Sequence, residues 1–180
     1  MPVIKYTTKK GLVQSTGKNL VDLGPSASVK RRADKAPEMQ TLVFMYDFDA
    51  LGGAASELTL TDANGNAQSI PRGFVIVDGW VEVITAVTSG GSATMVIGTA
   101  GTSNDPDGFV TTSNGAKAVL ALSAIVGLDG ALVTDKDGTA VVRKKIVTTD
   151  DPVTTTVATA VVTAGKWYLH LRGYHSLSVA

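Results

Sequence analysis

From residue 40 onward, short runs of β-branched and aromatic residues recur, and Gly, Asn and Asp separate them. Runs of this kind, spaced about ten residues apart, are typical of a sandwich, a jelly roll or a barrel. We therefore predict an all-β fold for residues 38–180, an antiparallel sandwich or jelly-roll-like domain of seven or eight strands. The predicted strands are residues 41–48, 56–62, 73–87, 93–99, 139–149, 154–163 and 166–174.

One long connection has a different pattern. Between residues 115 and 125, small and apolar residues recur at helical spacing, namely Ala116, Val119, Leu120, Ser123 and Ala124. This spacing predicts one short helix. The pair Asn64-Gly65 predicts a tight turn, since these two residues readily adopt positive φ.

Length and composition limit the protein to few classes. With 180 residues, 44% of them hydrophobic, the chain is long enough for one domain with a real core. The sequence has no cysteine, which excludes disulfides, thiolate metal sites and a cysteine nucleophile. No apolar run approaches the roughly 20 residues that a membrane span needs. We expect neither a membrane segment nor an export signal.

The charge is distributed unevenly although it sums to zero. Residues 1–37 carry only two acidic residues, Asp22 and Asp34, and therefore have a formal charge of +6, which leaves −6 for residues 38–180. The composition of residues 1–37 predicts an extended arm that becomes ordered on an oppositely charged surface. Tyr6 is the arm's single aromatic residue, which disfavours nucleic acid as a partner. The basic residues of the arm are Lys5, Lys9, Lys10, Lys18, Lys30, Arg31, Arg32 and Lys35.

The segment TSGGSAT, residues 88–94, is the first candidate for chemistry. A nucleophile elbow needs Gly-x-Ser-x-Gly between a strand and a helix, and neither Ser89 nor Ser92 fits that pattern. A phosphate-binding loop would need a lysine followed by Ser or Thr, which is missing here. We interpret the segment as a hairpin loop in which Gly90 and Gly91 supply positive φ.

Acidic residues occur in pairs, and each pair has two possible explanations. Oxygen-rich loops can hold calcium, but Asp and Asn before Gly also form turns by binding their own backbone. No loop matches an EF-hand, and we favour turns over a metal site. Asp47 and Asp49 are expected on one face of a strand, where they form a weak candidate for a glycosidase pair. The other pairs are Asp62 with Asn64 and Asn66, Asp105 with Asp107, Asp135 with Asp137, and Asp150 with Asp151.

The two histidines do not indicate a catalytic or metal site. Strand alternation places His170 on the face opposite Trp167, as a partly exposed residue. His175 falls on the other face from His170, so the two are not expected to share a zinc ion. We therefore predict that the protein is not an enzyme and that it needs no cofactor or metal.

Residues 70–99 resemble a recurring β module of tailed-bacteriophage virion proteins. The resemblance extends through residues 104–112 and 163–176, covers about residues 42–174, and brings no catalytic residues. It is carried by Ile70, Pro71, Gly73, Val75, Ile76, Val81, Val83, Thr85, Ala86, Ser89, Gly90, Ser92, Ala93, Thr94, Ile97 and Gly98.

This resemblance implies a capsid decoration (cement) protein or a related minor head or fibre protein. Its partners would be the major capsid protein and further copies of itself in a homotrimer, on the capsid surface of a virion made in the host cytoplasm. The basic arm has no counterpart in the module, so its role is argued from charge: its eight Lys and Arg residues would bind the capsid or staple neighbouring subunits. The alternative is a head-fibre or tail adhesion module that binds a host glycan or receptor.

Overall fold

The computed structural model describes residues 3–7, 11–16, 19–23, 38–100, 105–132 and 151–175. The chain divides into two units, residues Met1–Ala36 and Pro37–Ala180. Unit 1 pairs three short strands in the order β1 (Val3–Thr7), β2 (Gly11–Thr16) and β3 (Asn19–Leu23), all antiparallel. The sequence predicts an extended arm here, whereas the pairing of these strands was not predicted.

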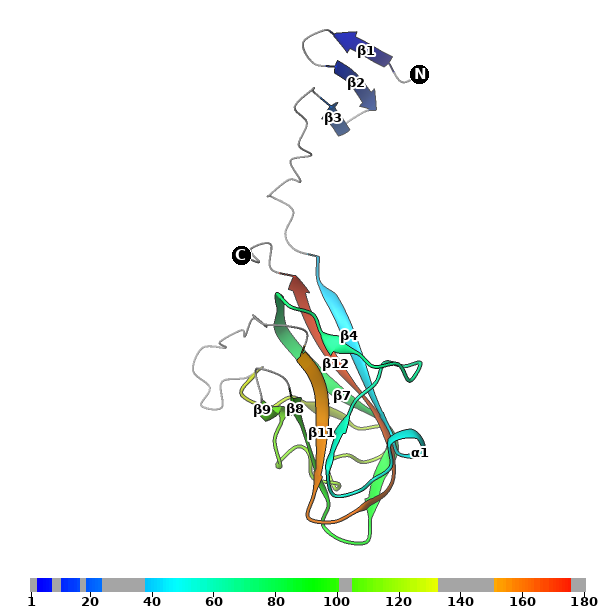
Figure 1. Ribbon diagram of the computed structural model, residues 1–180, viewed down its shortest axis with the longest axis vertical. Helices are drawn as coiled ribbons and strands as arrows, with labels where there is room; N and C mark the ends of the chain where they lie inside the picture. The colour runs from blue at the N-terminus through cyan, green and yellow to red at the C-terminus, as the bar shows by residue number, and fades with distance from the viewer. Residues whose placement is uncertain are drawn as a thin grey trace. The chain divides into compact units, whose positions relative to one another are not determined.

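Unit 2 is a sandwich of two antiparallel sheets, which confirms the predicted fold class (Figure 1). The four-stranded sheet has the order β10 (Ile125–Gly127), β7 (Phe74–Ser89), β12 (Val162–His175) and β4 (Gln40–Asp47). The five-stranded sheet has the order β5 (Glu57–Thr59), β11 (Asp151–Ala158), β8 (Thr94–Thr99) and β9 (Asp105–Val110), and β6 (Ser69–Ile70) also pairs with β11.

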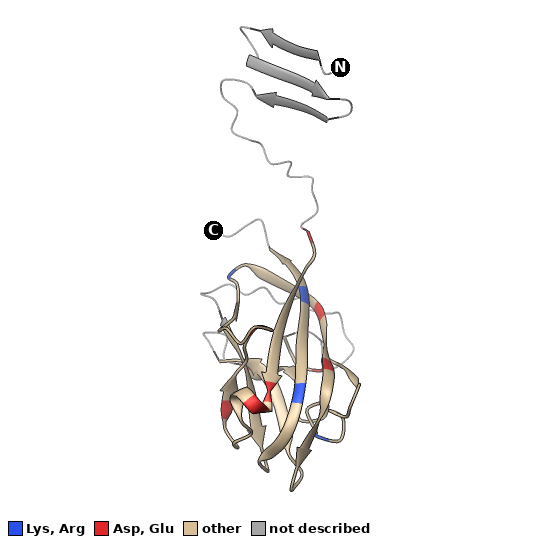
Figure 2. Cartoon of the chain, turned by 90° about the vertical axis from the view of Figure 1, so that its right-hand side faces the viewer, with Lys and Arg blue, Asp and Glu red and all other residues tan. Residues whose placement is uncertain are grey.

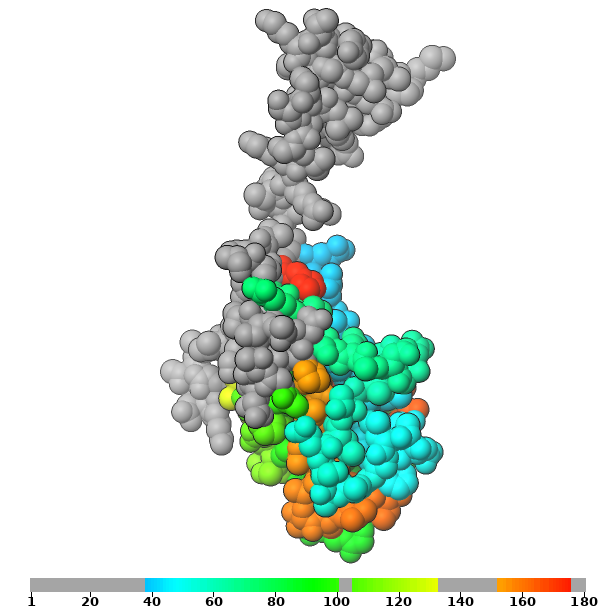
Figure 3. Space-filling model, in the orientation of Figure 1, coloured from blue at the N-terminus to red at the C-terminus, as the bar shows by residue number. Residues whose placement is uncertain are grey.

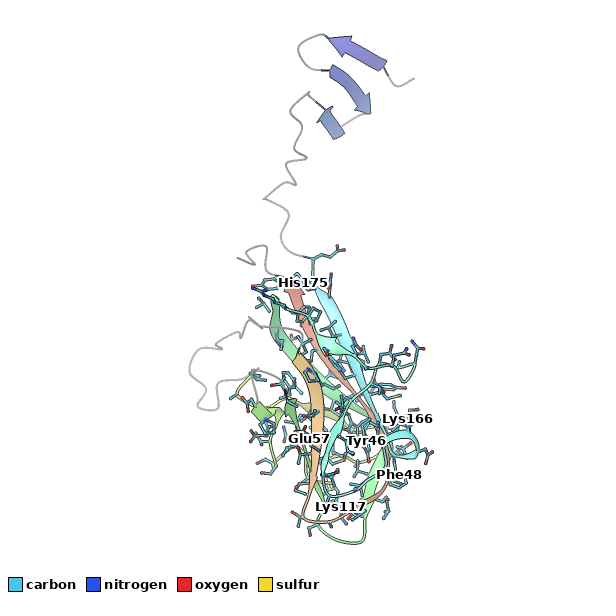
Figure 4. All side chains as sticks on the ribbon, viewed as in Figure 1. Tyr46, Phe48, Glu57, Lys117, Lys166 and His175 are labelled. Atoms are coloured by element: carbon cyan, nitrogen blue, oxygen red, sulfur yellow. The ribbon has the colours of Figure 1, made fainter. Side chains whose placement is uncertain are left out.

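The core lies between the two sheets and is built by strand alternation. On β12, every second residue from Gly165 to Gly173 is turned inward and buried, and Val162 at the start of the strand is also buried, so this strand lines the core along most of its length. Trp167 is fully buried and stacks on Tyr46 of β4, with 5.3 Å between ring centroids. The Tyr46 hydroxyl donates to the Gly52 carbonyl at 2.8 Å, and burial raises the pKa of Tyr46 to about 12. Tyr46, Phe48 and Lys166 lie at the same end of the body (Figure 4).

The predicted strands correspond to β4, β5, β7, β8, β11 and β12, and the run at 73–87 forms a single strand of 16 residues. The strand predicted at residues 139–149 lies outside the described residues. Strands β6, β9 and β10 were not predicted, because each is short or contains turn-forming residues such as the Asp, Pro and Gly of β9. Residues between β4 and β7, cyan to blue-green in Figure 3, form an outer layer on one side of the body.

The helix predicted at residues 115–125 is wrong, because this segment is a series of turns. Its internal bonds form only isolated turns, in which Val119 and Leu120 donate to the Ala116 carbonyl. Other N–H groups bond outside the segment, because Lys117 donates to the Ala93 carbonyl and Ser123 to the Val83 carbonyl. Leu120 is fully buried, whereas Val119 is exposed, so the segment covers the sandwich edge through single apolar residues. The helix found in the described residues is α1 (Phe48–Leu51), which Asp47 caps.

The TSGGSAT segment joins two different sheets, because β7 belongs to the four-stranded sheet and β8 to the five-stranded sheet. The interpretation as a hairpin with positive φ at Gly90 and Gly91 is therefore wrong, and neither glycine has positive φ. Gly91 is required for a different reason, since a Cβ there would lie 2.9 Å from the Cβ of Ala160. A turn does form at Asn64-Gly65, with Gly65 at φ 83°, but the positive φ expected at both positions is not found, because Asn64 has negative φ.

Replacing Trp167 with Ala is expected to lower the free energy of unfolding by about 3–5 kcal/mol, because it leaves a cavity beneath Tyr46 in the core. Urea denaturation followed by circular dichroism measures this loss. Val161→Ala is the matched control at an exposed position next to β12, and it should change stability by less than about 0.5 kcal/mol. Equal losses in both variants would contradict the assigned core.

Candidate interaction surface

The outward face of the four-stranded sheet carries charged and aromatic side chains along β12. The outward positions of this strand alternate with the buried positions of the core, so they form one row on the surface. In chain order, the row begins with a cation, continues with an aromatic ring and then returns to basic residues. Its members are Lys166, Tyr168, His170 and Arg172.

Each basic residue in this row contacts a carboxylate on a neighbouring strand. Figure 2 shows the acidic and basic positions side by side on the long strands. Exposed pairs of this kind contribute little to stability, but they fix the positions of the charged groups on the face. The pairs are Lys166 Nζ with Asp47 Oδ2 at 2.7 Å, His170 Nε2 with Glu82 Oε2 at 3.1 Å, and Arg172 with Asp78, bonded through both nitrogens of the guanidinium edge.

These contacts shift the pKa values of Asp47, Lys166 and Arg172. The hydrogen bond from Lys166 holds the pKa of the Asp47 carboxyl below its ordinary value, and the same bond raises the pKa of Lys166. The hydrogen bond to Asp78 raises the pKa of Arg172. The charged forms of all three groups are therefore favoured at neutral pH.

An aromatic cluster lies between these ion pairs. Trp80 of β7 stacks on the imidazole of His170, with 4.9 Å between ring centroids and 12° between planes. Tyr168 meets the same imidazole edge-on at 6.4 Å. His170 retains 17% side-chain exposure, which confirms the predicted partly exposed strand histidine. The exposed Ile125 of β10, paired in register with Glu82, extends the apolar part of this face.

The candidate glycosidase pair does not form as predicted, because β4 ends at Asp47 and Asp49 belongs to α1. Asp47 instead accepts a hydrogen bond from the Asp49 N–H at 3.1 Å and caps the helix. A glycosidase acid needs a raised pKa, whereas the pKa of Asp47 is lowered by Lys166. A cavity of about 200 Å³ lies beside the pair, lined by Asp47, Phe48, Asp49, Thr85, Ala164, Gly165 and Lys166.

Ser89 of the TSGGSAT segment has a structural hydrogen-bonding role. Its Oγ donates to the Val161 carbonyl at 2.7 Å and accepts from the Gly91 N–H at 3.2 Å. Lys117 Nζ donates to the Ser89 carbonyl at 3.0 Å. These bonds tie the connection between β7 and β8 to the one between β11 and β12.

Of the described acidic loops, the one at Asp62 follows the turn interpretation. Asp62 Oδ1 accepts the backbone N–H groups of Asn64 and Asn66 at 2.8 Å, and the bonds from Asn66 lower its pKa. Within the described residues no group of three His, Cys, Asp or Glu could hold a metal ion. Asp105 and Asp107 lie within the strand β9. The pair Asp135 and Asp137, and Asp150 of the last pair, fall outside the residues that the structure describes.

The predicted basic arm is described only in part. Lys5 lies in β1, while Lys9, Lys10, Lys18, Lys30, Arg31, Arg32 and Lys35 fall outside the described residues. By sequence, the described part of unit 2 contains four basic and eleven acidic residues, a formal charge of −7. Across the described ranges, no helix has the length and hydropathy of a membrane span.

Comparisons with known proteins give one informative similarity. No family model matches the chain, and no curated protein matches it. Among solved structures, a chain of the cyanophage Pam1 capsid asymmetric unit is similar, with a TM-score of 0.51 and 16% sequence identity. The match covers 84% of this chain and 99% of the Pam1 chain. At this identity the match shows a shared fold.

In the Asp47→Asn variant, the free energy of unfolding is expected to fall less steeply with decreasing pH than it does in the wild type. Because the pKa of Asp47 is lowered in the folded state, its contribution is present above the ordinary value of 3.8 and is lost as the pH falls through the lower, folded value. The stability difference between wild type and Asp47→Asn should therefore shrink as the pH drops below about 4. Urea denaturation at a series of pH values measures it.

Two further variants test whether the ion pair with Lys166 causes the pH dependence. Asp47→Ser keeps an acceptor for the Asp49 N–H but loses the ion pair, so it should behave like Asp47→Asn in acid. Lys166→Met removes the principal cause of the pKa shift and should also flatten the curve. An acid profile in Lys166→Met identical to that of wild type would contradict the assignment.

Proposed function

We propose that this chain is a bacteriophage structural protein that binds the outer capsid surface as a decoration (cement) protein. The observation that carries the proposal is the fold similarity to a chain of a phage capsid asymmetric unit, which extends over 99% of that chain. The resemblance of residues 70–99 to a virion β module supports the same class. The proposed partners are the major capsid protein and further copies of this chain, in a homotrimer on the virion surface.

The body has the properties that such a role requires. Its core is a continuous apolar layer between two sheets, and its polar side chains are used in turns and in cross-strand pairs. Two of the candidates for catalysis, Ser89 and Asp47, are held in structural hydrogen bonds. These observations support a rigid binding protein.

The arm is proposed to staple neighbouring subunits. Residues 1–37 have a formal charge of +6, and the described part of unit 2 has a formal charge of −7. Opposite potentials steer association and fix which surfaces meet. A basic arm attached to an acidic body therefore favours contacts between one copy and the next.

A second candidate function, adhesion to a host glycan, is favoured by one observation. Trp80 and Tyr168 are only half-buried on the outer sheet face, and exposed aromatic rings can stack on sugars. They lie within strands, however, and not at loop tips, which makes adhesion the weaker proposal.

Neutralising the basic segment of the arm is expected to weaken binding to capsids. The variant Lys30→Gln/Arg31→Gln/Arg32→Gln/Lys35→Gln in the full chain removes four positive charges. Sedimentation with shells assembled from the major capsid protein of the same genome, with a count of bound copies per shell, should show affinity lower by about tenfold or more. Wild-type binding should weaken with added salt, because exposed charges are screened.

The matched control removes the same number of positive charges from the body, through Lys136→Gln/Arg143→Gln/Lys144→Gln/Lys145→Gln. It should bind shells like the wild type. Equal binding by wild type and arm variant would refute stapling by the arm. Absence of shell binding by the wild type, together with binding to host cells, would favour adhesion instead.

A further inference from the structure

We propose that the outer face of the four-stranded sheet receives the basic segment of residues 30–35 from a neighbouring copy of the chain. This inference rests on the proposed function, because there the arm connects neighbouring copies. It goes further by naming the surface that the arm binds. The receiving surface, called here the outer sheet face, consists of Asp78, Trp80, Glu82, Tyr168, His170 and Arg172.

The outer side of the four-stranded sheet, which includes the outer sheet face, carries most of the half-buried Phe, Tyr and Trp side chains in the described body. Four Phe, Tyr or Trp side chains of unit 2 are half-buried in the described ranges, while the remaining Phe, Tyr and Trp side chains there are buried in the core. Trp80, Tyr168 and Tyr174 point outward from β7 and β12, and only Phe48 lies elsewhere, in α1. Tryptophan, tyrosine and arginine are the residues most enriched at the energetic centres of protein interfaces.

Space is available beside the Trp80 ring. His170 covers one side of the indole by stacking on it. On the other side, β10 places Gly127 directly opposite Trp80 in the strand register. Among the described residues, a Cβ built on Gly127 would meet no atom within 4 Å, so this part of the chain leaves the position open. The arrangement leaves room for a planar group to lie against Trp80.

The charges next to this opening suit a basic occupant. Asp78 and Glu82 each keep 43% side-chain exposure although each already contacts one basic residue. A carboxylate has about four acceptor positions, so one existing partner leaves capacity for a second. Arginine combines a planar cation that stacks on aromatic rings with a donor pair that fits a carboxylate.

The segment of residues 30–35, KRRADK, has this chemistry. Arg31 and Arg32 are adjacent, with Lys30 and Lys35 at the two ends. It ends shortly before β4, and the intervening Ala36-Pro37 step favours extended backbone. Delivery to a second copy follows from the proposed function, in which the arm connects neighbouring copies.

The absence of cysteine from the sequence permits a clean cross-linking test. One preparation of the full chain carries Ala33→Cys in the basic segment, and a second, size-tagged preparation carries Ile125→Cys, an exposed position in register with Glu82. The two are mixed in solution in a glutathione redox buffer, and mixed disulfide dimers are counted by mass spectrometry. The control partner is Thr59→Cys, exposed on β5 of the other sheet.

We expect at least about fivefold more mixed dimer with Ile125→Cys than with Thr59→Cys. Adding Trp80→Ser or Glu82→Gln to the Ile125→Cys chain should reduce the yield, whereas Glu57→Gln, an exposed acid on β5, should not. Thermal unfolding of each variant identifies any loss through misfolding.

Equal yields with Ile125→Cys and Thr59→Cys would overturn the proposal. A second outcome would also overturn it. A chain that carries both Ala33→Cys and Ile125→Cys would form an intramolecular disulfide at high dilution, while the mixed dimers would fail to form. Failure here is distinguishable from failure of the decoration role. Shell binding that depends on the arm, without preferential cross-linking, refutes only this surface, and preferential cross-linking without shell binding refutes only the decoration role.

Discussion

The antiparallel pairing of β7 with β12 is the interaction on which the rest of the body depends. These are the two longest described strands, of 16 and 14 residues, and they form the centre of the four-stranded sheet. Their register turns Trp167 and Leu169 into the core and places Tyr168 and His170 on the outside. One alignment of two strands therefore produces both the packed interior and the outer sheet face, and a slip by one residue would exchange them.

Sequence patterns predicted the strands well and the connections poorly. Long alternating runs such as the one at residues 73–87 encode a strand directly, since alternation has only one structural explanation. The segment at 115–125 has helical spacing, but the N–H groups of Lys117 and Ser123 bond to Ala93 and Val83, and this tertiary pairing overrides the local preference. The TSGGSAT segment looked like a hairpin because sequence does not reveal which of two sheets the next strand joins.

Only part of the candidate surface could be predicted from the sequence. The excess of positive charge in the arm can be counted directly, whereas the outer sheet face is assembled from residues far apart in the chain. Glu82 and His170 are separated by 88 positions, and Asp78 and Arg172 by 94. The available signal was the outward row on β12, where Lys166, Tyr168, His170 and Arg172 alternate with buried residues. Their acidic partners required the strand register.

The hydroxyl of Tyr46 sets an alkaline limit for the body. Its folded pKa of about 12 lies above the ordinary value of 10, so the folded state holds this proton more tightly than the unfolded chain. The corresponding stability is complete below pH 10 and is lost as the pH rises from 10 toward 12. Because this phenol stacks on Trp167, its ionisation would place a negative charge beside the largest side chain of the core.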